Sequence, residues 1–183
     1  MKVLFLDHDG VICLLNNFGT RFKKGKGSMT DKSILDRFDD FDKKAINTLN
    51  KIIEETDCEI VVSSDWKQWA TVEELGEYYE HQGIIKKPLD FTTSINDIEV
   101  PKDFKWNRNY GHEQTRCFEI HAWLEKHPEV THWVAVDDMY LGITKTDINE
   151  DSTWGLKNFV WCPNVYEGIK QTGIKDKIMS FFL

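Results

Sequence analysis

Two carboxylates follow the first apolar segment of the chain. Residues 3–6 are apolar, and Asp7 and Asp9 come next with His8 between them. Side chains alternate along an extended strand, so Asp7 and Asp9 point to one face and His8 to the other. Two carboxylates aimed at one place repel each other, and a cation makes that arrangement tolerable. The pattern therefore predicts a magnesium site at the carboxyl end of a parallel strand, where open α/β sheets place their ligands.

Two other strand ends carry polar side chains suited to the same site. Asp137 and Asp138 follow the apolar residues 133–136, and Ser63 and Ser64 follow another short apolar run. The carboxyl ends of parallel strands lie along one edge of a sheet, so the two acidic pairs can converge on one cation. A serine hydroxyl at that edge can donate a hydrogen bond to a phosphate oxygen. One of the two serines can instead cap the helix that follows.

Gly10 and Arg116 complete the predicted site. Gly10 lets the backbone turn sharply where a side chain would block it. Arg116 lies at the start of the helix that leads to the Asp137 strand, and its planar guanidinium suits phosphate. The alternative is an ordinary surface arginine paired with Glu113 or Glu119. The basic residues that could take its place are Lys67, Lys105 and Arg108.

The composition is that of one globular domain. Of the 183 residues, 40% are hydrophobic and 30% are charged. No apolar run approaches the length of a membrane span, and the first residues lack the basic region and cleavage site of a signal peptide. The four cysteines form no CxxC pair, which favours reduced thiols in a cytoplasmic protein. A net charge of −8 argues against a broad surface for nucleic acid.

Strands and helices alternate along the chain. Apolar runs predict strands over residues 3–6, 59–63, 132–138 and 157–162. Helical spacing of apolar residues predicts helices over 42–55, 68–81, 113–127 and 166–183. Residues 13–41 are expected to be irregular and residues 86–113 to be mostly loop. Because helices separate the strands, we predict a single α/β domain over residues 1–183 with a mostly parallel sheet.

The order of these motifs resembles a known superfamily. The sequence DHDGV, a strand-end serine, a basic residue and a strand-end DD are similar to the four motifs of the haloacid dehalogenase (HAD) superfamily. The segments FDKKAINTLNKIIEETDCEIVVSSDWK and RCFEIHAWLEKHPEVTHWVAVDD resemble the HAD domains of Swiss-army-knife RNA repair proteins. The resemblance covers Val3 to about Cys162. It implies a three-layer αβα Rossmann-like core with a minimal cap.

The resemblance also implies a phosphatase mechanism that uses Mg²⁺. Asp7 would attack phosphorus to form an aspartyl-phosphate, and Asp9 would act as general acid and then general base. Ser63 is favoured as the phosphate-binding hydroxyl because family hydroxyls lie at the first position after the strand. Ser63 and Arg116 would share the phosphoryl charge. Magnesium would be held by the acidic pairs, namely Asp7, Asp9 through its backbone carbonyl, Asp137 and Asp138.

The substrate is expected to be bulky because neither interval between motifs has room for a large cap. We predict a phosphorylated nucleotide or the terminal phosphate of a nucleic acid, and no membrane partner. The alternatives are a small-metabolite phosphatase and a non-catalytic HAD-like binding or regulatory module. The side chains of Lys23, Lys24 and Lys26 could contact a backbone phosphate of the substrate, or they could lie in a solvated loop without a binding role. The residues predicted to contact substrate are Gly10, Ser64, Trp66, Lys23, Lys24 and Lys26, with Trp69 also considered.

Overall fold

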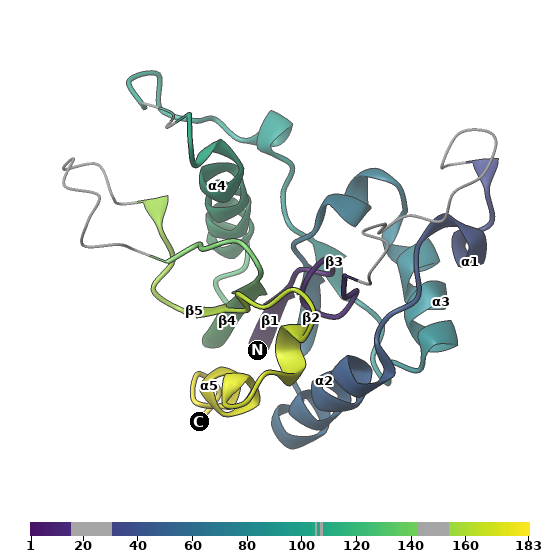
Figure 1. Ribbon diagram of the computed structural model, residues 1–183. Coiled ribbons are helices and arrows are strands. Elements are labelled where there is room, and N and C mark those ends of the chain that lie inside the picture. Colours follow the sequence, from purple (N-terminus) through teal and green to yellow (C-terminus); the bar gives the residue numbers. More distant parts are fainter. Residues whose placement is uncertain (16–30, 105, 107, 143–153) are drawn as a thin grey trace.

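An all-parallel sheet forms the centre of the molecule (Figure 1). The computed structural model describes residues 1–15, 31–104, 106, 108–142 and 154–183. In these residues five strands pair in the order β3-β2-β1-β4-β5. Because β1 is the middle strand, the residues that follow it lie at the centre of the sheet edge. The strands are β1 (Lys2–Leu6), β2 (Glu59–Val62), β3 (Asp90–Phe91), β4 (His132–Asp137) and β5 (Phe159–Trp161).

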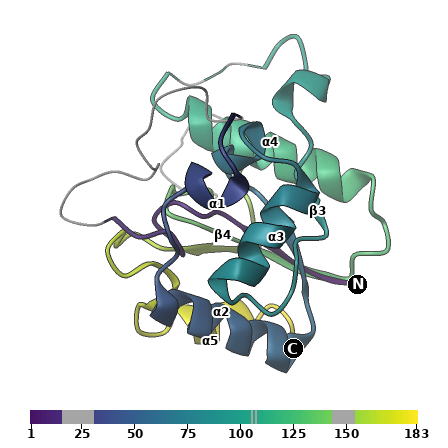
Figure 2. The same ribbon diagram turned by 90° about the vertical axis from the view of Figure 1, so that its right-hand side faces the viewer.

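Helices cover both faces of the sheet, which gives three layers. Figure 2 shows α4 on one side of the sheet and α2 and α5 on the other. The α/β class and the Rossmann-like arrangement predicted from the sequence are confirmed. None of the described helices is long and apolar enough to cross a membrane. The helices are α1 (Ile34–Arg37), α2 (Lys43–Thr56), α3 (Val72–Gln82), α4 (Gly111–Glu125) and α5 (Ile174–Met179), with short 3-10 helices η2 (Asp65–Gln68), η3 (Ile95–Asp97) and η5 (Gly168–Lys170).

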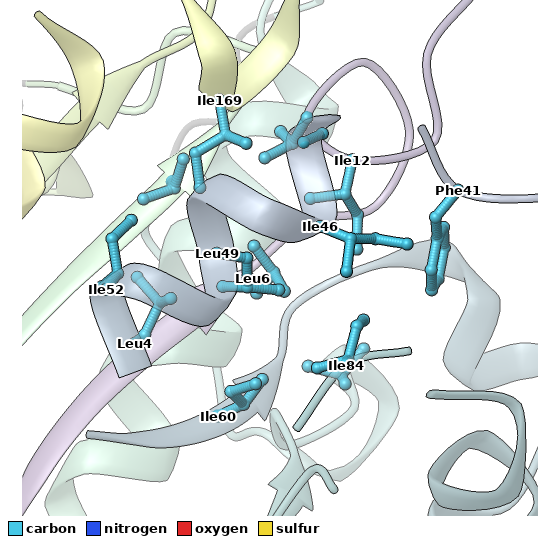
Figure 3. Close-up of a cluster of buried hydrophobic side chains, with 14 of the residues drawn as sticks. Leu4, Leu6, Ile12, Phe41, Ile46, Leu49, Ile52, Ile60, Ile84 and Ile169 are labelled. Atoms are coloured by element: carbon cyan, nitrogen blue, oxygen red, sulfur yellow. The ribbon is translucent and has the colours of Figure 1, made fainter. Parts of the chain in front are cut away.

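The alternation of side chains in β1 divides the core in two. Leu4 and Leu6 pack against α2, as Figure 3 shows, while Phe5 packs on the α4 side against Trp123. The same alternation directs Asp7 toward α4 and His8 toward the α2 and α3 face. His8 is fully buried, as predicted, and its Nε2 lies 2.6 Å from the Tyr79 hydroxyl. The strand pattern therefore places the first carboxylate on the face that α4 covers.

Capping residues set the ends of the helices beside the site. The Asp42 carboxylate accepts hydrogen bonds from the first turn of α2. A capping box between Thr71 and Glu74 begins α3, which ends at Gly83 with φ +90°. The end of the helix lies within one residue of the predicted end at 81, but the predicted start at 68 is wrong. Residues 65–68 instead form η2, because Ser64 caps a separate short turn directly after β2.

Three further segments compare with the sequence prediction in different ways. The described part of residues 86–113 is mostly loop, as expected from the sequence, and it also contains the edge strand β3 and the helix η3. The tail expected to form one helix over 166–183 is divided into η5 and α5. Glycines with positive φ break it: Gly168 has φ +54° and lies against the Val11 carbonyl, and Gly173 has φ +83°. The interval 13–41 contains the one-turn helix α1.

Candidate active site

Three carboxylates meet at the carboxyl edge of the sheet. Asp7, Asp137 and Asp138 each offer an oxygen, and these atoms lie within 4.8 Å of one another. Asp7 follows β1 and Asp137 ends the neighbouring strand β4, so sheet pairing brings the two together. The backbone N–H of Asp7 donates to the Val136 carbonyl at 3.1 Å, which extends this pairing to the carboxylate itself. Four residues were predicted to hold the metal, and the structure brings together the carboxylates of Asp7, Asp137 and Asp138. The fourth, Asp9, was predicted to contribute its backbone carbonyl.

Gly10 allows the third carboxylate to reach this cluster. Its φ is +74°, in the left-handed region that favours glycine. A Cβ atom at this position would lie 2.5 Å from Asp138 Oδ2 and 2.7 Å from Asp138 Cβ. The turn also returns the chain onto itself, because the His8 carbonyl accepts the backbone N–H groups of residues 11–13. Gly10 is therefore needed both for the turn and for the close approach of Asp138.

Burial makes the negative charge of the cluster costly. Asp7 and Asp137 are almost completely buried, and this burial raises the pKa of both carboxyls. The like charge of Asp7 raises the pKa of Asp137 further. Arg116 opposes both shifts. A hard divalent cation fits this donor set, because its charge would offset the repulsion and its preferred ligands are carboxylate oxygens.

Arg116 reaches the cluster from the second turn of α4. Its Nη1 donates to Asp7 Oδ1 and to Asp137 Oδ2, both at 3.1 Å, and to the Ser63 carbonyl. Its Nη2 donates to Asp65 Oδ1 at 3.2 Å. The arginine is buried and the surrounding carboxylates raise its pKa, so it is a permanent cation here. The structure thus places Arg116 inside the site rather than on the surface.

The two serines after β2 occupy different positions. The Ser64 hydroxyl caps η2 by accepting the Trp66 backbone N–H, and it lies close enough to Asp7 to lower the pKa of that carboxyl. The Ser63 hydroxyl is buried and has no hydrogen-bond partner among the described residues. A buried hydroxyl without a partner is costly and marks a place where a ligand oxygen would be accommodated. Both serines therefore lie at the site, and either position remains compatible with a phosphate oxygen.

Trp66 forms a hydrogen bond with the carboxylate of Asp9. Its indole N–H donates to Asp9 Oδ2 at 3.2 Å. The indole is stacked on Phe38, with ring centres 4.1 Å apart and planes at 7°, and it also packs against Phe41. Trp66 is fully buried, which argues against the predicted substrate contact. Its position instead fixes the orientation of the Asp9 carboxylate, a role that sequence reasoning missed.

A cavity of about 830 Å³ opens beside these residues. Lys67 projects into it, donating to Glu119 Oε2 at 2.5 Å and to Thr92 Oγ1 at 2.9 Å. Glu119 also accepts the Ile95 backbone N–H at 3.0 Å, so it ties η3 to α4. Asp7 and Asp9 both line the cavity. The lining residues are Asp7, Asp9, Asp65, Lys67, Gln68, Phe91, Thr92, Ser94, Ile95, Asn96, His112, Thr115, Arg116, Glu119, Asp138 and Met139.

Trp69, which the sequence also suggested as a substrate contact, is not brought to this cavity. It does not line the cavity, and its carbonyl accepts a hydrogen bond from Arg37. Lys23, Lys24 and Lys26 lie outside the described residues. Thr92 and Glu119 line the cavity and were missed as site residues. Thr92 follows β3 at the same sheet edge, so recognising that short strand would have drawn attention to it.

Comparison with protein families gives one match. The family model for the HAD domain in Swiss Army Knife RNA repair proteins matches residues 3–168. This range contains every carboxylate of the cluster, both serines and Arg116. The comparisons with curated proteins and with solved structures found no match.

Proposed function

The chain belongs to the family of HAD domains found in Swiss Army Knife RNA repair proteins, and on this basis we propose that it is a magnesium-dependent phosphomonoesterase. The observation that carries the proposal is the convergence of Asp7, Asp137 and Asp138 on one point, with Arg116 beside them. Members of this superfamily are usually phosphohydrolases. A buried acidic cluster beside a buried arginine and a cavity supports the same chemistry here.

The metal fits the residues present. Asp7, Asp137 and Asp138 would hold Mg²⁺, with the Asp9 backbone carbonyl as a further proposed ligand. Bound there, the ion would bring two anions together and draw charge from the phosphoryl oxygens. The buried carboxylates support this assignment because burial and mutual repulsion penalise their charges.

The proposed reaction has two displacements at phosphorus. In the first, an Asp7 oxygen attacks phosphorus, the bond to the leaving oxygen breaks, and Asp9 donates its proton to that oxygen. In the second, Asp9 takes a proton from water, the water oxygen attacks phosphorus, and the bond to Asp7 breaks to release phosphate. The Trp66 N–H on Asp9 Oδ2 holds the Asp9 carboxyl in a fixed orientation for these proton transfers.

Arg116 and the serines would bear the charge of the transferring group. Arg116 lies 3.1 Å from Asp7 and is fixed by Asp65, so it is already in place when a phosphate arrives. A hydroxyl from Ser63 or Ser64 would donate to a phosphoryl oxygen. The unpartnered hydroxyl supports Ser63, and the effect of Ser64 on the Asp7 pKa supports Ser64. Preorganised donors of this kind act on charge as it spreads in the transition state.

We further propose that the substrate is a phosphorylated nucleotide or the phosphorylated end of a nucleic acid. The family assignment supports this, since the matching domains are those of RNA repair proteins. A cavity of about 830 Å³ is large enough to admit more than the phosphate group alone.

Phosphate release tests the proposed function. Purified protein is assayed with an aryl phosphate, nucleoside monophosphates, and RNA oligonucleotides phosphorylated at either end, with Mg²⁺ or with excess chelator. We expect release only with Mg²⁺, none from Asp7→Asn, and a loss of about 10²–10⁴ for Asp9→Asn. Lys175→Gln is the matched control, because Lys175 pairs with Glu55 on the opposite face. Full activity in chelator, or near-normal activity of Asp7→Asn, would contradict the proposal.

A further inference from the structure

The charge around the site is unfavourable for holding a nucleic-acid backbone. Among the described residues, Lys67 and Arg116 line the cavity, and both are already paired with carboxylates: Lys67 with Glu119, and Arg116 with Asp7, Asp137 and Asp65. The chain as a whole carries a net charge of −8. A second phosphate next to the reacting one would therefore gain little here. Recognition of a nucleotide would depend on its uncharged parts.

An exposed pair of aromatic rings lies next to the acidic cluster. Tyr140 is 40% exposed and Trp161 is 44% exposed. Their ring centres are 5.3 Å apart and their planes meet at 87°, so the edge of one ring lies against the face of the other. Phe159 supports Tyr140 from the strand below, with ring centres 5.7 Å apart. The pair is thus held in place while much of its surface remains in water.

Backbone contacts connect this pair to the site. Trp161 is the residue of β5 that pairs with Asp137 of β4, and these strands are neighbours in Figure 1. The Trp161 indole N–H donates to the Asp138 carbonyl at 2.9 Å. Tyr140 follows Asp138 by two positions, with Met139 of the cavity wall between them. The two rings are therefore anchored beside the acidic cluster, next to the residues that line the cavity.

We propose that Tyr140 and Trp161 form a stacking surface for the nucleobase of the nucleotide whose phosphate is removed. This inference rests on the proposed function and specifies how that site selects its substrate. Every base presents an aromatic face, so stacking holds nucleotides of any sequence and requires no positive charge. That property suits an acidic site. A free mononucleotide and an RNA end share this chemistry, and the experiment separates them.

Another exposed tryptophan provides a matched control. Trp106 is also 44% exposed, but it packs against Phe104 and against Phe118 of α4 rather than beside the strand ends of β4 and β5. The exposure of Trp106 is close to the 40% of Tyr140, so any nonspecific affinity of an exposed aromatic ring for bases should be similar at these two positions. A difference between the Trp106→Leu and Tyr140→Leu variants therefore reports position and not aromatic content.

Binding to RNA with and without a terminal base tests the inference. Asp7→Asn protein, which the proposed mechanism makes unable to turn over, is titrated with Mg²⁺ into fluorescent RNA oligonucleotides phosphorylated at one end. The terminal nucleotide is either normal or abasic, and both ends are tested. We expect the normal end to bind at least about tenfold more tightly, a ratio within the range of base stacking on aromatic rings. Nucleoside monophosphates and ribose 5-phosphate are then used as competitors. Competition by a nucleoside monophosphate as strong as that by the RNA end would indicate a free nucleotide as the ligand, and much weaker competition would indicate an RNA end.

Second substitutions distinguish base stacking from contacts with the phosphate backbone. In the Asp7→Asn background, Tyr140→Leu should reduce the normal-to-abasic ratio to near one, while Tyr140→Phe and Trp106→Leu should retain it. The ratio should hold as salt rises, whereas a preference set by lysine contacts with the backbone would fall. Equal binding of normal and abasic ends, or a ratio unaffected by Tyr140→Leu, would overturn the inference. The proposed phosphatase function is tested by a different measurement, namely phosphate release by the wild-type protein. If no phosphate is released, the proposed function fails, and the ratio of binding to normal and abasic ends can still be measured.

Discussion

Replacing Gly10 by alanine should damage both the fold and the acidic cluster. Two costs arise at this position. A side chain in the left-handed region costs about 1–2 kcal/mol. The added Cβ would also meet Asp138, whose own Cβ would be 2.7 Å away, and overpacking of this kind costs about 1–3 kcal/mol. We therefore expect Gly10→Ala to lose about 2–5 kcal/mol of unfolding free energy.

Gly83→Ala separates the two costs. Gly83 has φ +90°, but a Cβ built there meets no atom within 4 Å. This variant has the conformational cost alone, so the difference between the two variants measures the clash with Asp138. Urea unfolding monitored by circular dichroism gives both free energies. The same titrations with Mg²⁺ measure how strongly the ion stabilises each protein.

Equal behaviour of the two variants would refute this reasoning. Relief of the clash requires Asp138 to move away from Gly10, so Mg²⁺ should stabilise Gly10→Ala less than it stabilises Gly83→Ala. If the two variants lose the same free energy and respond equally to Mg²⁺, the close approach of Asp138 has no energetic role. A third carboxylate would then be unnecessary for the site.

Further predictions concern residues around the first motif. Burial lowers the pKa of His8 from 6.5 to about 3, so the unfolded chain takes up a proton at this residue when the folded protein does not. Stability should therefore fall with pH below 6.5, by about 2 kcal/mol from this residue between pH 7 and pH 5. Urea unfolding at pH 7 and pH 5 gives the difference in unfolding free energy between the two pH values. His8→Gln should reduce this difference by about 2 kcal/mol, and an unchanged difference would show that His8 does not cause it. Trp66→Phe keeps the stacking on Phe38 but removes the N–H from Asp9. We expect kcat on an aryl phosphate to fall by about tenfold or more while the variant stays folded, and wild-type kcat would show that Asp9 needs no such partner.

Much of the fold follows from local patterns. The apolar runs at residues 3–6 and 133–136 could be assigned to buried parallel strands because helical segments separate the predicted strands. The strand β3 could not, since it has only two residues, Asp90 and Phe91, and depends on pairing with β2. The C-terminal tail was misjudged for a related reason. The approach of Gly168 to the Val11 carbonyl, which is distant in sequence, and the positive φ of Gly173 show why one continuous helix does not form.

Some residues of the candidate site could likewise be predicted from the sequence, and others could not. Asp7, Asp137 and Asp138 were predictable because strand ends in a parallel sheet share one edge, which is a rule of topology. Trp66 was identified as a residue near the site, but its contact with Asp9 depends on how an indole packs among Phe38 and Phe41. Sequence spacing contains no information about such packing. Contacts between side chains therefore required the structure, whereas the positions of the strand ends did not.

Trapping the covalent intermediate tests the central claim most directly. The protein is mixed with a phosphorylated substrate and Mg²⁺, quenched in acid, and treated with borohydride, which reduces an aspartyl-phosphate to homoserine. Peptide mass spectrometry then locates the modified residue. We predict homoserine at position 7 in the wild-type protein and none in the Asp7→Asn variant. Release of phosphate with no modification at Asp7, or with modification at another carboxylate, would contradict the proposed mechanism.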